Sequence, residues 1–259
     1  MKTKLVLFFL VATVLAKAQD TPSELVTDRP DQSESAKVVP LKALQIETGL
    51  ILETYDAEYI TIKNTTYNTT LLRYGLLEDF ELRLGLSYVS QERTYTNGID
   101  KVTSSGMSPL HTGFKVELFE EKGWLPQLAF LGSLLVPATA AEAFKPDYLA
   151  PGMRFAFAHT LTDQLSLGYN LGAEWDGDSA APYYFYSLVV GIGVGDHMAL
   201  FLETYGYKPD GEQIQPLVDA GLTFLLRNNL QFDISGGLGL KDNVPDNFLS
   251  VGLTYRMPR

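Results

Sequence analysis

Charged side chains recur at every second position in several segments of this chain, and their spacing is the first sign of chemistry. One such run is Glu81-Leu82-Arg83-Leu84-Gly85. Side chains two positions apart lie on the same face of a β-strand. Acids and bases on that face could pair with charges on facing strands, or they could line a water-filled path for a solute.

Catalysis would need a histidine beside a nucleophile or a pair of carboxylates. The chain has three histidines, His111, His159 and His197. His159 and His197 lie beside predicted turns, and His111 shares its strand face with Lys115 and Glu117 but with no nucleophile at strand spacing. Because a lone histidine is usually an ordinary polar residue, the sequence favours a protein that is not an enzyme.

The sequence carries no recognisable zinc, calcium or phosphate-binding signature. The stretch 242–247, Asp-Asn-Val-Pro-Asp-Asn, is acidic enough to hold a cation, but a solvated loop explains it equally well. The stretch 191–195, Gly-Ile-Gly-Val-Gly, has strand periodicity and no helix after it, so it does not match a phosphate-binding loop. We therefore expect neither a cofactor nor a metal.

Alternation of apolar and polar residues extends over most of the chain after residue 40. It is clearest in Leu82–Tyr88 and Leu165–Leu171, where every second residue is apolar. This pattern predicts strands with one apolar and one polar face, and hence an all-β fold, an antiparallel up-and-down transmembrane β-barrel of about 12 strands. The predicted strands lie near 41–54, 63–76, 79–91, 105–118, 124–137, 147–160, 163–176, 181–194, 197–207, 214–226, 229–241 and 246–257.

The N-terminal region predicts export and divides the chain into three parts. Lys2 and Lys4 precede the apolar run Leu5–Leu15, and Ala16-Lys17-Ala18 supplies a small-x-small cleavage site. We expect a signal peptide over 1–18, a polar periplasmic N-terminal arm over 19–40 that could tuck into the barrel mouth, and the transmembrane barrel over 41–259. The predicted location is the outer membrane of a Gram-negative bacterium, in contact with its lipid.

Composition supports a membrane barrel over the alternatives. Hydrophobic residues make up 46% of the chain, and the net charge of −11 argues against nucleic-acid binding. A soluble β-sandwich or a lipocalin-like barrel would also show alternation. However, the predicted strands exceed the usual length of about 5–6 residues and better match a tilted membrane strand, which needs about 9–11. We expect no transmembrane helix, because no later apolar run is long enough.

The predicted connections alternate between short turns and longer links. The turns fall at 77–78, 120–123, 161–162, 195–196 and 227–228, and the longer links at 56–62, 92–104, 138–146, 177–180, 208–213 and 242–245. Membrane barrels have short periplasmic turns and longer external loops. The alternation therefore places both termini of the chain in the periplasm.

If the apolar residues of each strand face lipid, the other set faces the lumen. In the predicted lumen, eight acids outnumber five bases, and many glycines leave free space. Two interpretations stay open: a water-filled path whose acidic excess disfavours anions, or a lumen filled by a salt-bridge network, since an unpaired buried charge is costly. The residues predicted to line the lumen are Glu47, Glu53, Arg73, Glu81, Arg83, His111, Lys115, Glu117, Arg154, Glu174, Phe201, Glu203, Tyr205, Asp219, Asp233 and Arg256.

Aromatic residues gather near the predicted strand ends, as in the interfacial girdle of membrane barrels. We expect most of them to face lipid in such a girdle, although stacking on an aromatic solute is the alternative. Phe201 and Tyr205 share the register of Glu203 and are the better candidates for contact with the lumen. The predicted girdle comprises Trp124, Tyr169, Trp175, Tyr183, Tyr184, Tyr186, Tyr207 and Tyr255.

Several stretches resemble the bacterial "phenol meta-pathway degradation" family of outer-membrane transporters, in a Bacteroidetes-type form. They are the segment Leu25–Ser35 with its Thr-Asp-Arg-Pro-Asp motif, then 44–49, 71–76, 80–85 and the closing segment 246–255. The resemblance covers most of the chain after residue 18. It implies a β-barrel that passes small hydrophobic or aromatic compounds.

The last predicted strand also resembles the signal that the barrel-assembly machinery reads during biogenesis. The signal-like residues are Ser250, Gly252, Tyr255 and Met257, although this chain continues to Arg259 where many barrels end on an aromatic residue.

Taken together, the sequence predicts a barrel for passive or gated passage of a small solute. The alternative is a non-transporting structural or interaction barrel whose lumen is filled by salt bridges. An outer-membrane barrel enzyme ranks third.

Overall fold

The computed structural model describes residues 24–95, 100–241 and 244–257, and these residues form one closed barrel. The predicted signal peptide lies outside the described residues, as do Asp242 and Asn243 of the acidic loop. The strands are β1 Leu44–Ala57, β2 Ile60–Leu77, β3 Phe80–Tyr95, β4 Lys101–Met107, β5 Leu110–Phe119, β6 Gln127–Val136, β7 Ala150–Thr162, β8 Leu165–Glu174, β9 Tyr183–Val194, β10 Met198–Pro209, β11 Gln215–Arg227, β12 Leu230–Gly239 and β13 Asn247–Met257.

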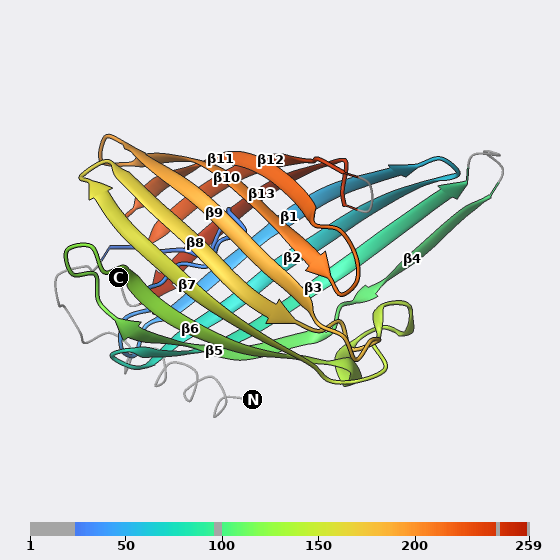
Figure 1. Cartoon of the computed structure of the whole chain (residues 1–259), viewed down its shortest axis with the longest axis horizontal. Helices are drawn as coiled ribbons and strands as arrows, with labels where there is room; N and C mark the ends of the chain where they lie inside the picture. Colours follow the sequence, from blue (N-terminus) through green and yellow to red (C-terminus); the bar gives the residue numbers. More distant parts are fainter. Residues whose placement is uncertain (1–23, 96–99, 242–243, 258–259) are drawn as a thin grey trace, which may run out of the picture.

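Each strand pairs antiparallel with its neighbours, and β1 pairs with β13 to close the barrel (Figure 1). β3 pairs with β5 along its N-terminal half, Phe80–Gly85, and with β4 along its C-terminal half, Tyr88–Thr94. β4 and β5 therefore occupy one position, interrupted at Ser108 and Pro109, because proline cannot donate a ladder hydrogen bond. Among the described residues this makes the predicted twelve-strand antiparallel barrel, which is confirmed.

Connections differ between the two ends of the barrel. At one end, here the turn end, strands join at 78–79, 163–164 and 228–229. At the other, the loop end, longer connections run over 137–149 and 175–182, the first containing two 3-10 turns, η1 Pro137–Thr139 and η2 Glu142–Phe144.

Two predicted links at the loop end are wrong. Residues 56–62 form a tight hairpin, because β1 reaches Ala57 and β2 begins at Ile60. Most of the predicted link 92–104 is strand, with Glu92 paired to Thr103. Polar residues there alternate as strand residues do, so composition alone suggested loops where the backbone continues the ladder.

The two faces of the wall separate by polarity. On β13, Ser250, Thr254 and Arg256 are buried, whereas Leu249, Leu253 and Tyr255 are exposed on the outer face. An exposed belt of large apolar side chains suits lipid contact. None of the helical segments in the described parts of the chain is long and apolar enough to span a membrane.

Residues 24–40, here the internal arm, run inside the barrel rather than across its mouth (Figure 1). The arm folds back on itself, since the backbone N–H and the hydroxyl of Ser35 both donate to Asp28. The two ends of the arm lie at the turn end of the barrel. The Arg256 guanidinium donates to the Glu24 carbonyl, and just after the arm the backbone N–H of Lys42 donates to the Gly75 carbonyl. The arm is thus a loop inserted into the lumen from the turn end.

Gly75 permits the close approach of the arm to β2. A Cβ at this position would lie 2.1 Å from the Pro40 carbonyl oxygen and 2.4 Å from that of Val39. We expect Gly75→Ala to shift the end of the arm and destabilise the barrel by about 1–3 kcal/mol, seen as earlier unfolding in a heat-modifiability gel.

The matched control is Gly193→Ala, also within a strand. A Cβ there would meet nothing closer than Gln164, at 3.8 Å. Equal behaviour of the two variants would contradict the close packing of the arm end on β2.

Candidate functional site

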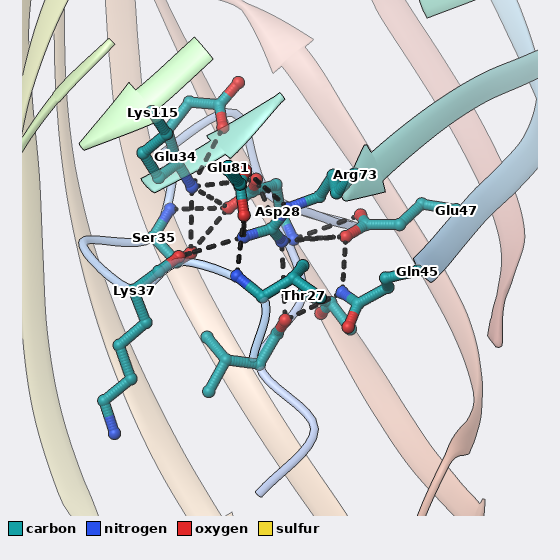
Figure 2. A network of polar contacts seen from close by, with 12 residues as sticks. Thr27, Asp28, Glu34, Ser35, Lys37, Gln45, Glu47, Arg73, Glu81 and Lys115 are labelled. Atoms are coloured by element: carbon teal, nitrogen blue, oxygen red, sulfur yellow. Dashed lines mark hydrogen bonds and ion pairs between the residues drawn. The ribbon is translucent and has the colours of Figure 1, made fainter. Parts of the chain in front are cut away.

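The Asp28 carboxylate lies at the centre of a buried cluster of charges (Figure 2). Its oxygens lie 2.6 Å from Arg83, 3.0 Å from Arg73 and 2.9 Å from Lys115. The three bases come from β2, β3 and β5, where they share one face of the sheet. The acids of the wall are Glu47 and Glu81, which pair with Arg73 at 2.9 Å each. We call these six residues the Asp28 cluster.

Electrostatics of the Asp28 cluster explain why the arm stays inside. Arg73 and Lys115 are fully buried, and a buried charge left without a partner is strongly destabilising. Burial by itself would raise the pKa of Asp28, but Arg73, Lys115 and Arg83 together hold that pKa well below its usual range. The arm therefore supplies a carboxylate that the wall bases require.

A second ion pair fastens the arm to β12 and β13, which follow β1 in the sheet on the side away from β2. Arg29 contacts Asp233 of β12 at 3.0 Å and donates to Ser250 of β13 at 2.9 Å. Gly252 makes room for it, because a Cβ at that position would lie 2.3 Å from the guanidinium. Arg29 thus fixes the N-terminal half of the internal arm to β12 and β13.

The tip of the arm contacts β8, β9 and β10 through hydrogen bonds, here the wall contact. The Gln32 backbone N–H donates to Glu203 at 2.7 Å, and the Ser33 hydroxyl donates to the same carboxylate at 2.6 Å. Ser33 and Ser187 share a hydrogen bond at 2.6 Å. Asn170 accepts from the Glu34 N–H at 2.6 Å and donates back to its carbonyl at 3.0 Å. The wall contact joins neighbouring strands at one level of the lumen.

Two carboxyl groups face each other beside the wall contact, with a third from the arm in the same region. Glu203 and Asp219 are directly opposite each other on β10 and β11, and Asp31 of the arm lies near both. Burial, followed by the Glu203 carboxylate, raises the pKa of Asp31 well above its usual value. Both oxygens of Asp219 are buried without a hydrogen-bond donor among the described residues.

An aromatic cluster fills the lumen between the arm and the loop end. Phe185, Tyr205 and Leu217 are buried there with Phe248, and Tyr207 packs against them. The Arg154 guanidinium lies 3.7 Å from the centre of the Phe185 ring and pairs with Glu174. Favourable cation–π contact of this kind is strongest where water is excluded.

Cavities lie on both sides of the arm tip. Towards the loop end is a cavity of about 230 Å³ lined by Glu34, His111 and Arg154, with a recess of about 770 Å³ near Tyr183 and Tyr207. Towards the turn end are two cavities of about 360 and 370 Å³ beside Glu24 and Leu25. Small residues of β7–β11 line this side, namely Ala158, Ser166, Gly168, Gly191, Gly193, Ala199 and Thr223. The arm tip therefore separates two groups of cavities.

The family described as "Putative MetA-pathway of phenol degradation" matches residues 27–257. The chain belongs to this family. No curated protein sequence matches the chain.

Solved structures share the fold of this phenol-degradation family member at low sequence identity. An outer membrane channel from Pseudomonas putida F1 superposes with a TM-score of 0.66 at 13% identity, covering 93% of this chain and 100% of that one. The translocator domain of the autotransporter NalP from Neisseria meningitidis gives 0.54 at 12% identity, with 98% and 97% covered. The NanC porin gives 0.50 at 9%, with 82% and 98% covered. At such identities the likeness shows the fold.

The structure places the predicted lumen residues of this family member on the inner face in distinct groups. Glu47, Arg73, Glu81, Arg83 and Lys115 form the Asp28 cluster. Asp233, Glu203, Glu117 and Arg256 contact the arm. Tyr205, Arg154 and Glu174 lie in or beside the aromatic cluster. His111 and Phe201 line cavities, and Asp219 faces Glu203. Glu53 is half-buried near Asn64. Whether they line a solute path stays a prediction.

Sequence reasoning missed the arm as the partner of the wall charges. Asp28, Arg29 and Glu34 belong to a segment without apolar periodicity, so nothing in its pattern places it in the lumen. The girdle prediction is also wrong for Tyr183 and Tyr207, whose rings pack together inside the barrel with centroids 5.7 Å apart. Both lie in inward register, Tyr207 with Glu203 and Tyr183 with Ser187, which was the available signal.

Removal of one base from the Asp28 cluster should be severe. We expect Arg73→Ala to lower the free energy of unfolding by about 3–5 kcal/mol, because it leaves Glu47, Glu81 and Asp28 buried with one fewer cation. Urea denaturation of the refolded barrel measures this.

The control is Lys101→Ala at the exposed Lys101–Glu92 pair, where the side-chain exposure of the lysine is 58%. An exposed pair contributes about 1 kcal/mol or less. Comparable losses in both variants would show that the cluster does not depend on burial.

Proposed function

We propose that this protein is an outer-membrane channel for small solutes whose path is closed by the internal arm. The observation that carries the proposal is the position of the arm tip between cavities that open toward the two ends of the lumen. About eight strands leave room only for side chains and about sixteen give an open channel. A twelve-strand barrel with an inserted loop suits a gated passage.

The orientation follows from the connections. Short turns in such barrels lie in the periplasm and longer loops outside. On that basis the arm enters from the periplasm, and the recess near Tyr183 and Tyr207 opens to the exterior. Export by a signal peptide over 1–18, a periplasmic origin of the arm and folding by the barrel-assembly machinery belong to the same proposal.

The two sides of the arm differ in how they are held. On β2, β3 and β5 the Asp28 cluster joins the arm to the wall by buried ion pairs. At the wall contact the arm tip is held by hydrogen bonds to Asn170, Ser187 and Glu203. Arg154 of β7 reaches the Gln32 carbonyl at 3.5 Å, but its ion pair is with Glu174 of the wall and not with a carboxylate of the arm. Net hydrogen bonds contribute about 1 kcal/mol each, less than it costs to separate a buried ion pair. The path therefore opens between the arm tip and β8–β10.

The lumen suits small solutes with apolar or aromatic parts. Phe185, Tyr205 and Leu217 offer apolar surface directly beyond the arm tip. Acids outnumber bases among the inward residues, which disfavours anions. The solved structures with similar folds are described as channels, porins and an autotransporter translocator, and we infer a transport role rather than a catalytic one.

A non-transporting barrel is the second candidate, and the Asp28 cluster favours it. A lumen cross-linked by buried ion pairs could serve stability alone, with the loop-end connections as an interaction surface. The two candidates differ in whether the arm tip can leave the wall contact.

A disulfide across the wall contact tests this directly. Ser33 and Ser187 have hydroxyl oxygens 2.6 Å apart, close to a disulfide length of about 2.05 Å, and the chain has no native cysteine. We expect Ser33→Cys with Ser187→Cys to conduct poorly in planar bilayers when oxidised, and to regain discrete, cation-preferring steps on reduction, because the tip is then released.

The single variants Ser33→Cys and Ser187→Cys are the controls, and their conductance should not respond to reductant. A folded double variant whose conductance is the same oxidised and reduced would contradict passage beside the arm tip. Absence of conductance from the wild type and the reduced double variant alike would favour the non-transporting barrel.

A further inference from the structure

The carboxyl groups of Glu203 and Asp219 face each other with one hydrogen-bond donor too few. Glu203 already accepts from the Gln32 N–H and the Ser33 hydroxyl. Asp219 lies within hydrogen-bonding reach of Glu203, yet both of its oxygens are buried without a donor in the described chain. Its residue exposure is only 3%. Two ionised carboxylates are both acceptors and cannot satisfy each other.

Every element around the pair adds acid or neutral groups. The arm brings Asp31, with Asp28 behind it. β10 brings Tyr205 and Tyr207. The nearby bases are engaged elsewhere: Arg29 pairs with Asp233 of β12, and Arg154 pairs with Glu174 of β8. No ion pair among the described residues therefore gives Glu203 or Asp219 a cation.

A ligand of positive charge would complete the pair. No set of three His, Asp or Glu side chains in the described residues is arranged to hold a metal ion. A single hydrogen placed between the two carboxyl groups turns Asp219 into a donor and leaves Glu203 free to accept from the arm. We propose that Glu203 and Asp219 bind one proton between them, and that this proton keeps the arm tip docked on the wall.

Loss of the proton would act on the arm through Asp31. The proton leaves to water, and Asp219, which is 3% exposed, then carries a full charge beside Glu203 and near Asp31. Like charges at close range in such surroundings repel strongly. The one group among them that can move away is Asp31, since it lies on a loop rather than on the sheet.

The surroundings of Asp31 agree with a role for this residue in releasing the arm tip. Burial and the Glu203 and Asp219 carboxylates all raise the pKa of Asp31, so a charge on Asp31 is disfavoured beside the pair. A group whose folded-state pKa is raised stabilises the docked state at low pH, and this contribution is lost as pH rises through the raised value. Protonation of the Glu203–Asp219 pair and of Asp31 therefore favours the docked arm tip at low pH, and loss of these protons favours its release at high pH.

The test combines two readouts on the refolded barrel, measured from about pH 4 to about pH 9, which covers ordinary and deeply buried carboxyl groups. The first is infrared absorption by a protonated carboxylic acid, which reports the proton directly. The second is the open probability in planar bilayers, which rests on the proposed function. We expect the wild type to lose the infrared band and to open as pH rises, by up to about tenfold per pH unit for one proton.

Three variants separate the parts of the proposal. Asp219→Asn should lose the part of the infrared band that comes from the pair, keeping only what Asp31 contributes, and stay closed at all pH values, because its amide donates to Glu203 permanently. Asp31→Asn should retain the band but lose most of the pH response of opening. Asp210→Asn, the same change at an exposed position at the loop end, should behave as the wild type.

Two results would overturn the proton site: an infrared band as strong in folded Asp219→Asn as in the wild type, or a wild type without any titrating band. A titrating band with conductance that ignores pH would overturn the link to the arm. If the protein is not a channel, no variant will conduct. The infrared measurement would then still decide whether Glu203 and Asp219 share a proton.

Discussion

A charge buried in a protein must meet an opposite charge, and this constraint organises the lumen. The wall brings Arg73, Arg83 and Lys115 together, and its own acids Glu47 and Glu81 do not surround them fully. Asp28 of the arm completes the cluster and contacts all three bases. Because removal of one partner leaves charge unpaired in a low-dielectric region, the arm is a structural part of the barrel and not an appendage.

The same constraint makes the two sides of the arm unequal. Where the wall supplies bases, the arm is held by ion pairs. Where it supplies Glu203 and Asp219, the arm is held by hydrogen bonds, and the Asp219 oxygens have no hydrogen-bond donor among the described residues. Small residues on β7–β11 leave cavities beside the weaker side. Electrostatics and side-chain size therefore indicate the same place for a path, along β8–β10, and the aromatic cluster near Phe185 lies next along it.

Lipid contact and lumen chemistry are separated by the pleat of the sheet. Period-two alternation sends Leu249, Leu253 and Tyr255 outward and Ser250, Thr254 and Arg256 inward on one strand. A shift of one residue in register would exchange the two sets, so the polarity pattern fixes register along with topology. Interruption at Ser108 and Pro109 is tolerated because β4 and β5 pair with successive parts of the same strand.

Local pattern in the sequence was enough to determine the twelve strand positions and the inward register of residues such as Arg73 and Glu203, because strand alternation repeats every two residues. It also carried the family resemblance through the Thr-Asp-Arg-Pro-Asp stretch. Only the tertiary structure decided that this stretch lies inside the lumen, that Tyr183 and Tyr207 pack inward, and that Glu203 faces Asp219 without a base. The place of the arm joins residues far apart in the chain and depends on a segment with no periodicity of its own, whereas the two wall pairings depend on the exact register of consecutive strands.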